Sequence, residues 1–178
     1  MRIISGLYKS RKIVAPKNLP VRPTTDMAKE GLFNILNNHF YFVEIAVLDL
    51  FAGTGNISYE FASRGTTQII CVDQDFGCIK FINQTAEAFN MSIQTIKSDV
   101  FKYLEKTTIK TNVIFADPPY GFADEQFYKI PELVLKNNLL HENGMLIIEH
   151  SKHTNLSNQK SFSFKKSYGS NIFSFFEL

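Results

Sequence analysis

The chain has 178 residues, enough for one domain with a substantial core, and its 44% hydrophobic and 20% charged residues are typical of a globular protein. Its apolar runs fall short of the ~18 residues that a membrane span needs, and its first residues lack the apolar core of a secretion signal. We therefore expect a cytoplasmic monomer that needs neither a membrane nor an obligate protein partner.

The net charge of +2 is unevenly distributed along the chain. Residues 1–22 hold six Lys or Arg residues and no acid, whereas residues 23–150 hold nine against sixteen acids. A basic arm on an acidic body is typical of a protein that contacts a polyanion, with a merely solubilising tail as the alternative. The side chains from which we expect contacts with phosphates are Arg2, Lys9, Arg11, Lys12, Arg22, Lys165 and Lys166.

The amino-terminal part is predicted to form an extension of the main domain. Ile3–Leu7 and Arg11–Val14 are two strand-like runs, which predict a short β-hairpin, and three prolines make residues 15–23 an extended connector. Residues 1–23 would then be the extension and residues 24–178 the domain. Thr24 and Thr25 are suitable N-caps for a helix that ends at Leu36 and presents Arg22 and Thr24 toward the space above it.

Apolar strand-like runs alternate with helical segments along the rest of the chain. The expected strands are 46–51, 68–73, 93–96, 113–116, 145–149, 162–166 and 172–176, and the expected helices are 57–64, 77–90, 100–106 and 126–137. Pro131 should kink or restart the last helix, and Asn143-Gly144 should turn the chain into the fifth strand. This order predicts an α/β fold, Rossmann-like, with a mostly parallel seven-stranded sheet and a carboxy-terminal antiparallel hairpin.

Several conspicuous side chains are expected to have structural roles. Cys71 and Cys78 lie in apolar surroundings, so we expect neither a disulfide nor a metal site. His150 and His153 are expected in a loop after the fifth strand. The five phenylalanines that alternate with polar residues near the end of the chain should pack in the core, and they are Phe162, Phe164, Phe173, Phe175 and Phe176.

Glycines and acids follow the first three expected strands, at the sheet edge where open α/β folds bind ligands. Gly53 and Gly55 let the backbone approach a ligand closely, and Asp73, eighteen residues after Gly55, is placed to accept hydrogen bonds from ribose hydroxyls. Asp99 could accept an N–H from a base amino group. The predicted cofactor-binding set is Asp49, Phe51, Gly53, Gly55, Asp73, Asp99 and Val100.

A nicotinamide dinucleotide is the alternative ligand for such a glycine loop. Its fingerprint requires a third glycine where this chain has Ser58, and its pyrophosphate requires N–H groups or cations. Asp49, four residues before the loop, instead favours a cationic ligand. S-adenosylmethionine carries both a sulfonium and an ammonium group, so the pattern favours this molecule as the cofactor.

The tetrapeptide Asp117-Pro118-Pro119-Tyr120 directly follows the apolar run 112–116. Neither proline has an N–H group, and Pro118 disfavours a helical backbone at Asp117, so the chain is held rigid beyond the strand tip. A fixed carboxylate, nearby carbonyl oxygens and an aromatic ring suit a nucleobase that stacks and donates N–H bonds, although a simple strand-ending turn is the alternative. The candidate catalytic residues are Asp117, Pro118, Pro119 and Tyr120.

Four segments together carry a family resemblance. They are residues 1–6 (MRIISG), 22–26 with 30–36 (RPTTD, EGLFNIL), 48–55 with 63–65 (LDLFAGTG, SRG) and 115–121 (FADPPYG). The chain resembles the bacterial 16S ribosomal RNA guanine-N2 methyltransferases, which are class I S-adenosylmethionine-dependent enzymes with a DPPY motif. It departs from their pattern at Asn56, Ser10 and Asp73, where a small residue, glycine and glutamate are usual.

The resemblance implies methylation of the exocyclic N2 of a guanine in a 16S rRNA loop, in small-subunit particles. We expect Asp117 and the Pro118 carbonyl to accept hydrogen bonds from that amine and Tyr120 to stack on the base. A carboxylate of ordinary pKa would take the proton only after transfer. Two alternatives stay open: an N-methyltransferase acting on another RNA or on DNA adenine, and a non-catalytic RNA-binding module that keeps the fold.

Overall fold

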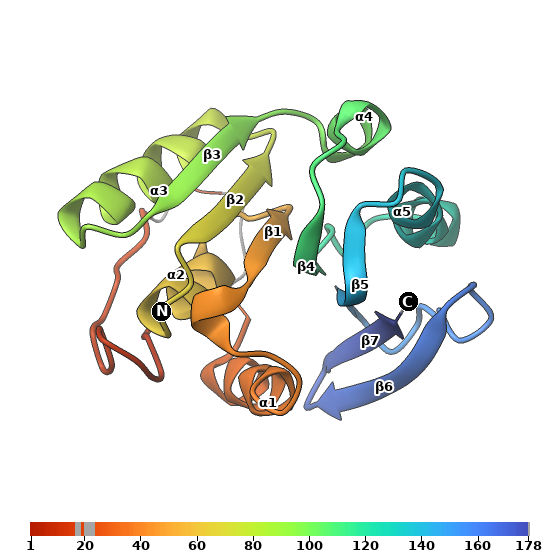
Figure 1. Ribbon diagram of the computed structural model, residues 1–178, viewed down its shortest axis with the longest axis horizontal. Coiled ribbons are helices and arrows are strands. Elements are labelled where there is room, and N and C mark those ends of the chain that lie inside the picture. The colour runs from red at the N-terminus through yellow and green to blue at the C-terminus, as the bar shows by residue number, and fades with distance from the viewer. Residues whose placement is uncertain (17–18, 20–23, 178) are drawn as a thin grey trace.

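The structure is a computed structural model that describes residues 1–16, 19 and 24–177. Within these residues, seven strands form one sheet in the order β3-β2-β1-β4-β5-β7-β6 (Figure 1). The strands are β1 (Ala46–Leu50), β2 (Gln68–Asp73), β3 (Ile93–Lys97), β4 (Thr111–Ala116), β5 (Leu140–His150), β6 (Phe162–Tyr168) and β7 (Asn171–Glu177). The first five are parallel, and β7 is antiparallel to β5 and β6. The predicted sheet and its carboxy-terminal hairpin are confirmed.

Helices cover both faces of the sheet because successive strand residues point to opposite sides. The helices are α1 (Asp26–Leu36), α2 (Asn56–Ser63), α3 (Phe76–Ala88), α4 (Val100–Lys106) and α5 (Asp124–Lys136), with a short 3-10 turn at Phe42–Glu44. Val47 and Val113 face the core that includes residues of α1, α2 and α3, whereas Leu48 and Ile114 face the core that includes residues of α4 and α5 (Figure 1). Among the described residues, none of the helices combines the length and the apolar surface that a membrane span requires.

Polar side chains cap the beginnings of α1 and α4. Thr25 caps α1 by accepting from the Ala28 amide at 3.2 Å, and Asp99 caps α4 by accepting from the Lys102 amide at 2.9 Å. The helix α5 runs through Pro131 as one element, so the expected restart at that proline does not occur.

The amino-terminal segment contains less strand than predicted. Arg2 and Lys12 form an isolated antiparallel bridge, so the expected strands Ile3–Leu7 and Arg11–Val14 are both wrong. Two successive amides of this segment donate to the buried Glu60 carboxylate at 2.8 and 3.0 Å, so a helix side chain takes the place of a partner strand. The expected connector at 15–23 lies largely outside the described residues.

The strand β5 begins earlier than predicted. The residues Asn143-Gly144 lie inside it, where pairing with β4 shifts register, so the expected turn is an irregularity within a strand. His150 is the last residue of β5 and is buried, with Nε2 at 2.8 Å from the Ser174 hydroxyl, so its expected loop position is wrong. His153 does lie beyond the strand and is exposed.

The expected packing roles of the cysteines and phenylalanines are borne out. Cys71 and Cys78 are free and buried. Three of the phenylalanines, Phe173, Phe175 and Phe176, are buried, and the Phe164 ring stacks on Phe175 with centroids 4.4 Å apart.

Candidate active site

A cavity of about 760 Å³ lies at the carboxyl ends of the central strands. Its lining is Thr24, Asp49, Phe51, Ala52, Gly53, Thr54, Asn56, Ile57, Asp73, Gln74, Asp75, Cys78, Asp99, Val100, Phe101, Phe115, Asp117, Pro118, Pro119, Tyr120, Phe122 and Gln126. This lining contains all four predicted catalytic residues and the predicted cofactor residues except Gly55. The glycine loop after β1 (residues 51–55) and the proline corner after β4 (residues 117–120) therefore lie at the same end of the sheet, where the parallel strands end.

The loop after β1 depends on left-handed backbone conformations. Phe51, Gly53 and Gly55 have φ values of +57°, +53° and +78°. A Cβ atom on Gly55 would lie 2.9 Å from the Tyr59 ring and 3.0 Å from Ile82. A side chain at position 55, at the start of α2, would therefore displace the Tyr59 ring or Ile82. The neighbouring residues Thr54 and Asn56 line the cavity.

Asp73 braces the same loop from β2. One carboxylate oxygen accepts from the Gly53 amide and the other from the Asp75 amide, both at 2.8 Å. Each oxygen keeps a second lone pair, so the side chain can still accept a hydrogen bond from a ligand hydroxyl. Asp73 can therefore hold the loop and accept from a ligand at the same time.

Two aromatic rings on the cavity wall were not predicted as functional, and both contact the predicted Phe51. Phe51, Phe101 and Phe122 contact one another with centroid separations of 5.6 to 6.2 Å, and the last two are stacked. Phe101 follows Asp99 and Val100, and Phe122 follows the proline corner. The two rings lie close together because the beginning of α4 packs beside the β4–α5 loop. A short sequence pattern cannot predict this contact between distant segments.

Asp49 lies at the floor of the cavity with 2% of its surface exposed. The Ser58 hydroxyl donates to its carboxylate at 2.6 Å. Burial raises the pKa of the Asp49 carboxyl to about 7, the hydrogen bond from Ser58 opposes this rise, and the charge of Asp73 adds to it. This side chain therefore changes its charge near neutral pH.

Asp117 is held at the end of β4, where its amide donates to the Leu50 carbonyl at 3.3 Å. Pro118 is buried, whereas Pro119 is exposed and the Tyr120 side chain is 47% exposed. Burial raises the pKa of the Asp117 carboxyl well above its ordinary value, and the charges of Glu149 and Asp49 raise it further. The expected ordinary pKa is therefore wrong, because the sequence shows neither this burial nor the nearby acids.

Glu149 is a buried acid near Asp117 that was not predicted as a site residue. It lies near the end of β5, is 1% exposed, and accepts hydrogen bonds from the Thr24 hydroxyl at 2.8 Å and from the Asn171 amide. Its position at the end of a strand is the same signal that pointed to Asp73 and Asp99. Thr24 lines the cavity, in accord with its expected orientation.

The predicted phosphate contacts are spread around the molecule. Arg2 and Lys12 lie side by side, and Arg2 makes an exposed ion pair of 3.1 Å with Asp26. Lys9 lies in the turn beside Ser63, at the end of α2 that faces away from the cavity. Arg11, Lys165 and Lys166 are exposed, and Arg22 lies outside the described residues.

Comparison with known proteins places the chain in a family. The sequence model of the family described as Conserved hypothetical protein 95 matches residues 1–177. The chain belongs to this family. It is 33% identical over 161 residues to YlbH of Bacillus subtilis, covering 88% of this chain and 85% of YlbH. It is 30% identical over 152 residues to ribosomal RNA small subunit methyltransferase D of Escherichia coli K12, covering 84% and 71%. The expected membership of a 16S rRNA methyltransferase family is confirmed.

Solved structures share the fold of this family member. The protein TTHA0928 of Thermus thermophilus superposes with a TM-score of 0.86 at 22% identity, over 100% of this chain and 99% of that chain. The 16S rRNA N2 G1207 methyltransferase RsmC of Thermus thermophilus, solved with AdoMet and guanosine, gives a TM-score of 0.69 at 20% identity, over 89% of this chain and 45% of that chain. The predicted Rossmann-like methyltransferase fold is confirmed.

Proposed function

We propose that this protein transfers a methyl group from S-adenosylmethionine to the exocyclic N2 of a guanine in 16S ribosomal RNA, within small-subunit particles. The observation that carries the proposal is that the corner from Asp117 to Tyr120 and the glycine loop after β1 line one cavity. Membership of an rRNA methyltransferase family supports the RNA substrate. The name of RsmC, a neighbour of the same fold, supports guanine N2 as the acceptor.

The cavity fits S-adenosylmethionine, the cofactor of this methyltransferase fold. Five aspartates line it and, among the described lining residues, no Lys, Arg or His does so. This charge suits a cationic ligand and opposes a pyrophosphate. The cavity volume of about 760 Å³ lies in the range of sites that hold ligands of this size. When bound, the cofactor supplies an electrophilic methyl group on a positively charged sulfur.

Each part of the cavity has a role toward that cofactor. Asp73 would accept from the ribose hydroxyls, and Asp99 with the Val100 backbone would bind the base edge. The apolar rings of Phe101 and Phe122 would pack on the cofactor and exclude water. Asp49 would attract the positive charge, because an ionised carboxylate at the cavity floor stabilises a nearby cation.

The proline corner serves the guanine. Its amino group is a weak nucleophile because the nitrogen lone pair is delocalised into the ring. Hydrogen bonds from this group to Asp117 and to the Pro118 carbonyl would stabilise the positive charge that grows on nitrogen during attack. The raised pKa of the Asp117 carboxyl makes it a stronger base than an ordinary aspartate, so it would also take the released proton. Tyr120 would stack on the base, a contact worth ~1–3 kcal/mol.

The substrate can be tested with labelled S-adenosylmethionine. Small subunits, deproteinised 16S rRNA and double-stranded DNA, all from a strain that lacks this protein, are offered as acceptors, with Asp117→Ala as the inactive control. We expect label in the subunit particles and none in DNA. Label in DNA, label in another RNA, or binding of RNA without any methyl transfer would overturn the proposal in favour of a different substrate or a non-catalytic module.

A further inference from the structure

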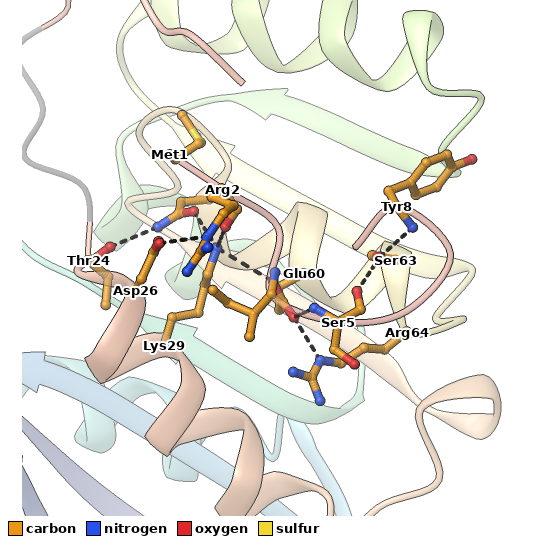
Figure 2. A network of polar contacts seen from close by, with 12 residues as sticks. Met1, Arg2, Ser5, Tyr8, Thr24, Asp26, Lys29, Glu60, Ser63 and Arg64 are labelled. Atoms are coloured by element: carbon orange, nitrogen blue, oxygen red, sulfur yellow. Dashed lines mark hydrogen bonds and ion pairs between the residues drawn. The ribbon is translucent and has the colours of Figure 1, made fainter. Parts of the chain in front are cut away.

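A buried polar network joins the amino-terminal segment to the cavity (Figure 2). At its centre is Lys29 of α1, which is 1% exposed. Its ammonium group donates to the Arg2 carbonyl at 2.6 Å and to the Asn56 side-chain oxygen at 2.9 Å, and it lies 3.5 Å from the Glu60 carboxylate. Two hydrogen bonds and one ion pair thus hold the ammonium group in place.

The network reaches the cavity through Asn56. This residue begins α2 directly after the glycine loop, and its amide nitrogen donates to the Thr24 carbonyl at 3.1 Å. The Thr24 hydroxyl in turn donates to Glu149 at 2.8 Å. Because Asn56 and Thr24 both line the cavity, these contacts connect Lys29 to one cavity wall.

On its other side, the network holds the amino-terminal arm, which we define as residues 1–13. The arm lies along α2, where Glu60 accepts two of its amides and Ser63 holds its turn. The Ser63 hydroxyl donates to the Ser5 carbonyl at 2.5 Å, and the Ser63 carbonyl accepts from the Leu7 amide at 2.7 Å. The arm is therefore bound to α2 over its whole turn and to Lys29 at its beginning.

A buried ammonium group is not explained by stability alone. Burial lowers the pKa of Lys29, and the charge of Glu60 opposes this change. Apolar side chains of the same volume often serve stability as well as a buried ion pair does, and the attested use of such pairs is to fix one geometry. Here the geometry that is fixed is that of the arm relative to the cavity wall.

We propose that Lys29 is a positioning residue that couples docking of the amino-terminal arm to cofactor binding. With the arm docked, Lys29 holds Asn56 and Thr24 in the positions that complete the cavity. Linkage is reciprocal, so the bound cofactor tightens the arm on α2 by the same factor. The inference depends only on the cofactor and not on the guanine specificity proposed above.

The first test displaces the arm at a point remote from the cavity. A Cβ atom on Gly6, whose φ is +82°, would lie 1.9 Å from the Ser63 carbonyl oxygen, so Gly6→Ala must lift the turn from α2. We expect Gly6→Ala and Lys29→Met each to weaken S-adenosylmethionine binding about five- to tenfold by calorimetry, and the double variant to be no weaker than either. Leu7→Ala, at an 81% exposed side chain in the same turn, is the matched control and should bind as the wild type does.

The second test reads the reciprocal effect in the wild-type protein. Hydrogen exchange of the arm amides is measured with and without S-adenosylhomocysteine, and we expect about fivefold slower exchange in its presence, with no slowing in Lys29→Met. Unchanged exchange in the wild type, or wild-type affinity in Gly6→Ala, would overturn the coupling even if Lys29→Met does not fold. Failure of S-adenosylhomocysteine to bind at all would overturn the cofactor assignment as well.

Discussion

The environment of Asp117 in the free protein and its proposed role favour opposite charge states of its carboxyl group. Its burial beside Glu149 and Asp49 favours the neutral form, whereas its proposed role as an acceptor for an amine needs the ionised form. The positive charge that develops on the attacking amine favours ionisation. The residue is therefore suited to gain its charge when the substrates are present.

Asp117→Asn tests this role with almost no change of shape. The amide has a weaker acceptor and cannot take a proton, so we expect methyl transfer to fall by a factor of about 10² to 10³. Binding of S-adenosylmethionine should stay within about twofold of the wild type, because the cofactor is proposed to occupy the other side of the cavity. Transfer rates with labelled cofactor and calorimetry measure the two quantities, and a variant that methylates at the wild-type rate would refute the acceptor role.

Asp49 should make cofactor affinity depend on pH. Its pKa is raised from an ordinary 3.8 to about 7 in the folded protein, so Asp49 stabilises the fold fully below pH 3.8, and this contribution is lost as the pH rises through 7. A cation favours the ionised form. Affinity for S-adenosylmethionine should therefore increase roughly three- to tenfold from pH 6 to pH 8.

Calorimetry at several pH values measures this dependence, and S-adenosylhomocysteine is the matched ligand because it lacks the positive charge on sulfur. Its affinity should change less over the same range, and Asp49→Asn should remove the difference between the two ligands. Equal pH dependence of both ligands in the wild type would mean that Asp49 does not face the sulfonium.

The residues that sequence could locate are those whose role follows from their place at a strand end. Asp73 and Asp99 are found in this way, whereas Asp49 is found as the one acid within an apolar strand, four residues before Gly53. Glu149 carries the same signal as Asp73 and Asp99, but its burial beside Asp117 depends on the packing of α1 and β7 against β5. The contact of Phe101, in the first turn of α4, with Phe122 and the raised pKa of Asp117 arise only where segments distant in sequence meet in the folded chain.

The contact between α1 and the β6–β7 hairpin places Thr24 above the cavity. Gly31 of α1 lies against the Tyr168 ring of β6, and a Cβ atom there would be 2.2 Å from that ring. The adjacent end of β7 supplies Asn171, which donates to Glu149. The last hairpin of the sheet and the first helix thus together position the residues around Asp117.

Gly31→Ala should destabilise the protein although alanine is the better helix former. The gain in helix propensity is about 1 kcal/mol, whereas forcing an added atom into a packed contact costs about 1–3 kcal/mol. We expect a net loss of about 1 kcal/mol in the free energy of unfolding, measured in urea. Gly121→Ala, where an added Cβ meets nothing within 4 Å, is the stability control. An unchanged or higher midpoint of urea unfolding for Gly31→Ala would show that the Tyr168 side chain moves aside without a cost in stability.

The order and type of the elements could be predicted from hydrophobic periodicity, because apolar residues recur at a different spacing in strands and in helices. Boundaries were less certain: β5 begins at Leu140 because an irregularity absorbs Asn143-Gly144 instead of a turn. The expected strand Ile3–Leu7 failed because its amides bond to Glu60, fifty-five or more residues away. The sequence pattern around residues 3–7 gives no sign of so distant a hydrogen-bond partner.

At the scale of the whole molecule, charge is separated between an acidic cavity and basic surface segments. Exposed Lys165 and Lys166 on β6 are proposed to bind phosphates. If both do, Lys165→Ser/Lys166→Ser should weaken rRNA binding and reduce the slope of log affinity against log salt by about 1.4 to 1.8. The measurement is a filter-binding titration at several salt concentrations.

The matched control for that variant is Lys106→Ser/Lys110→Ser. Both lysines are exposed and lie just before β4, at the end of the sheet opposite the cavity. The control should keep the wild-type slope. Equal slopes in all three proteins would place the RNA away from β6.

The proposed reaction in the cavity is methylation of the exocyclic nitrogen of guanine. It is tested most directly by digesting small subunits, methylated in vitro by this protein, to nucleosides and identifying the product by mass spectrometry. We expect one new product, N2-methylguanosine, at a single position of 16S rRNA. A methylated adenosine, or a guanosine methylated on the ring or on the ribose, would contradict it.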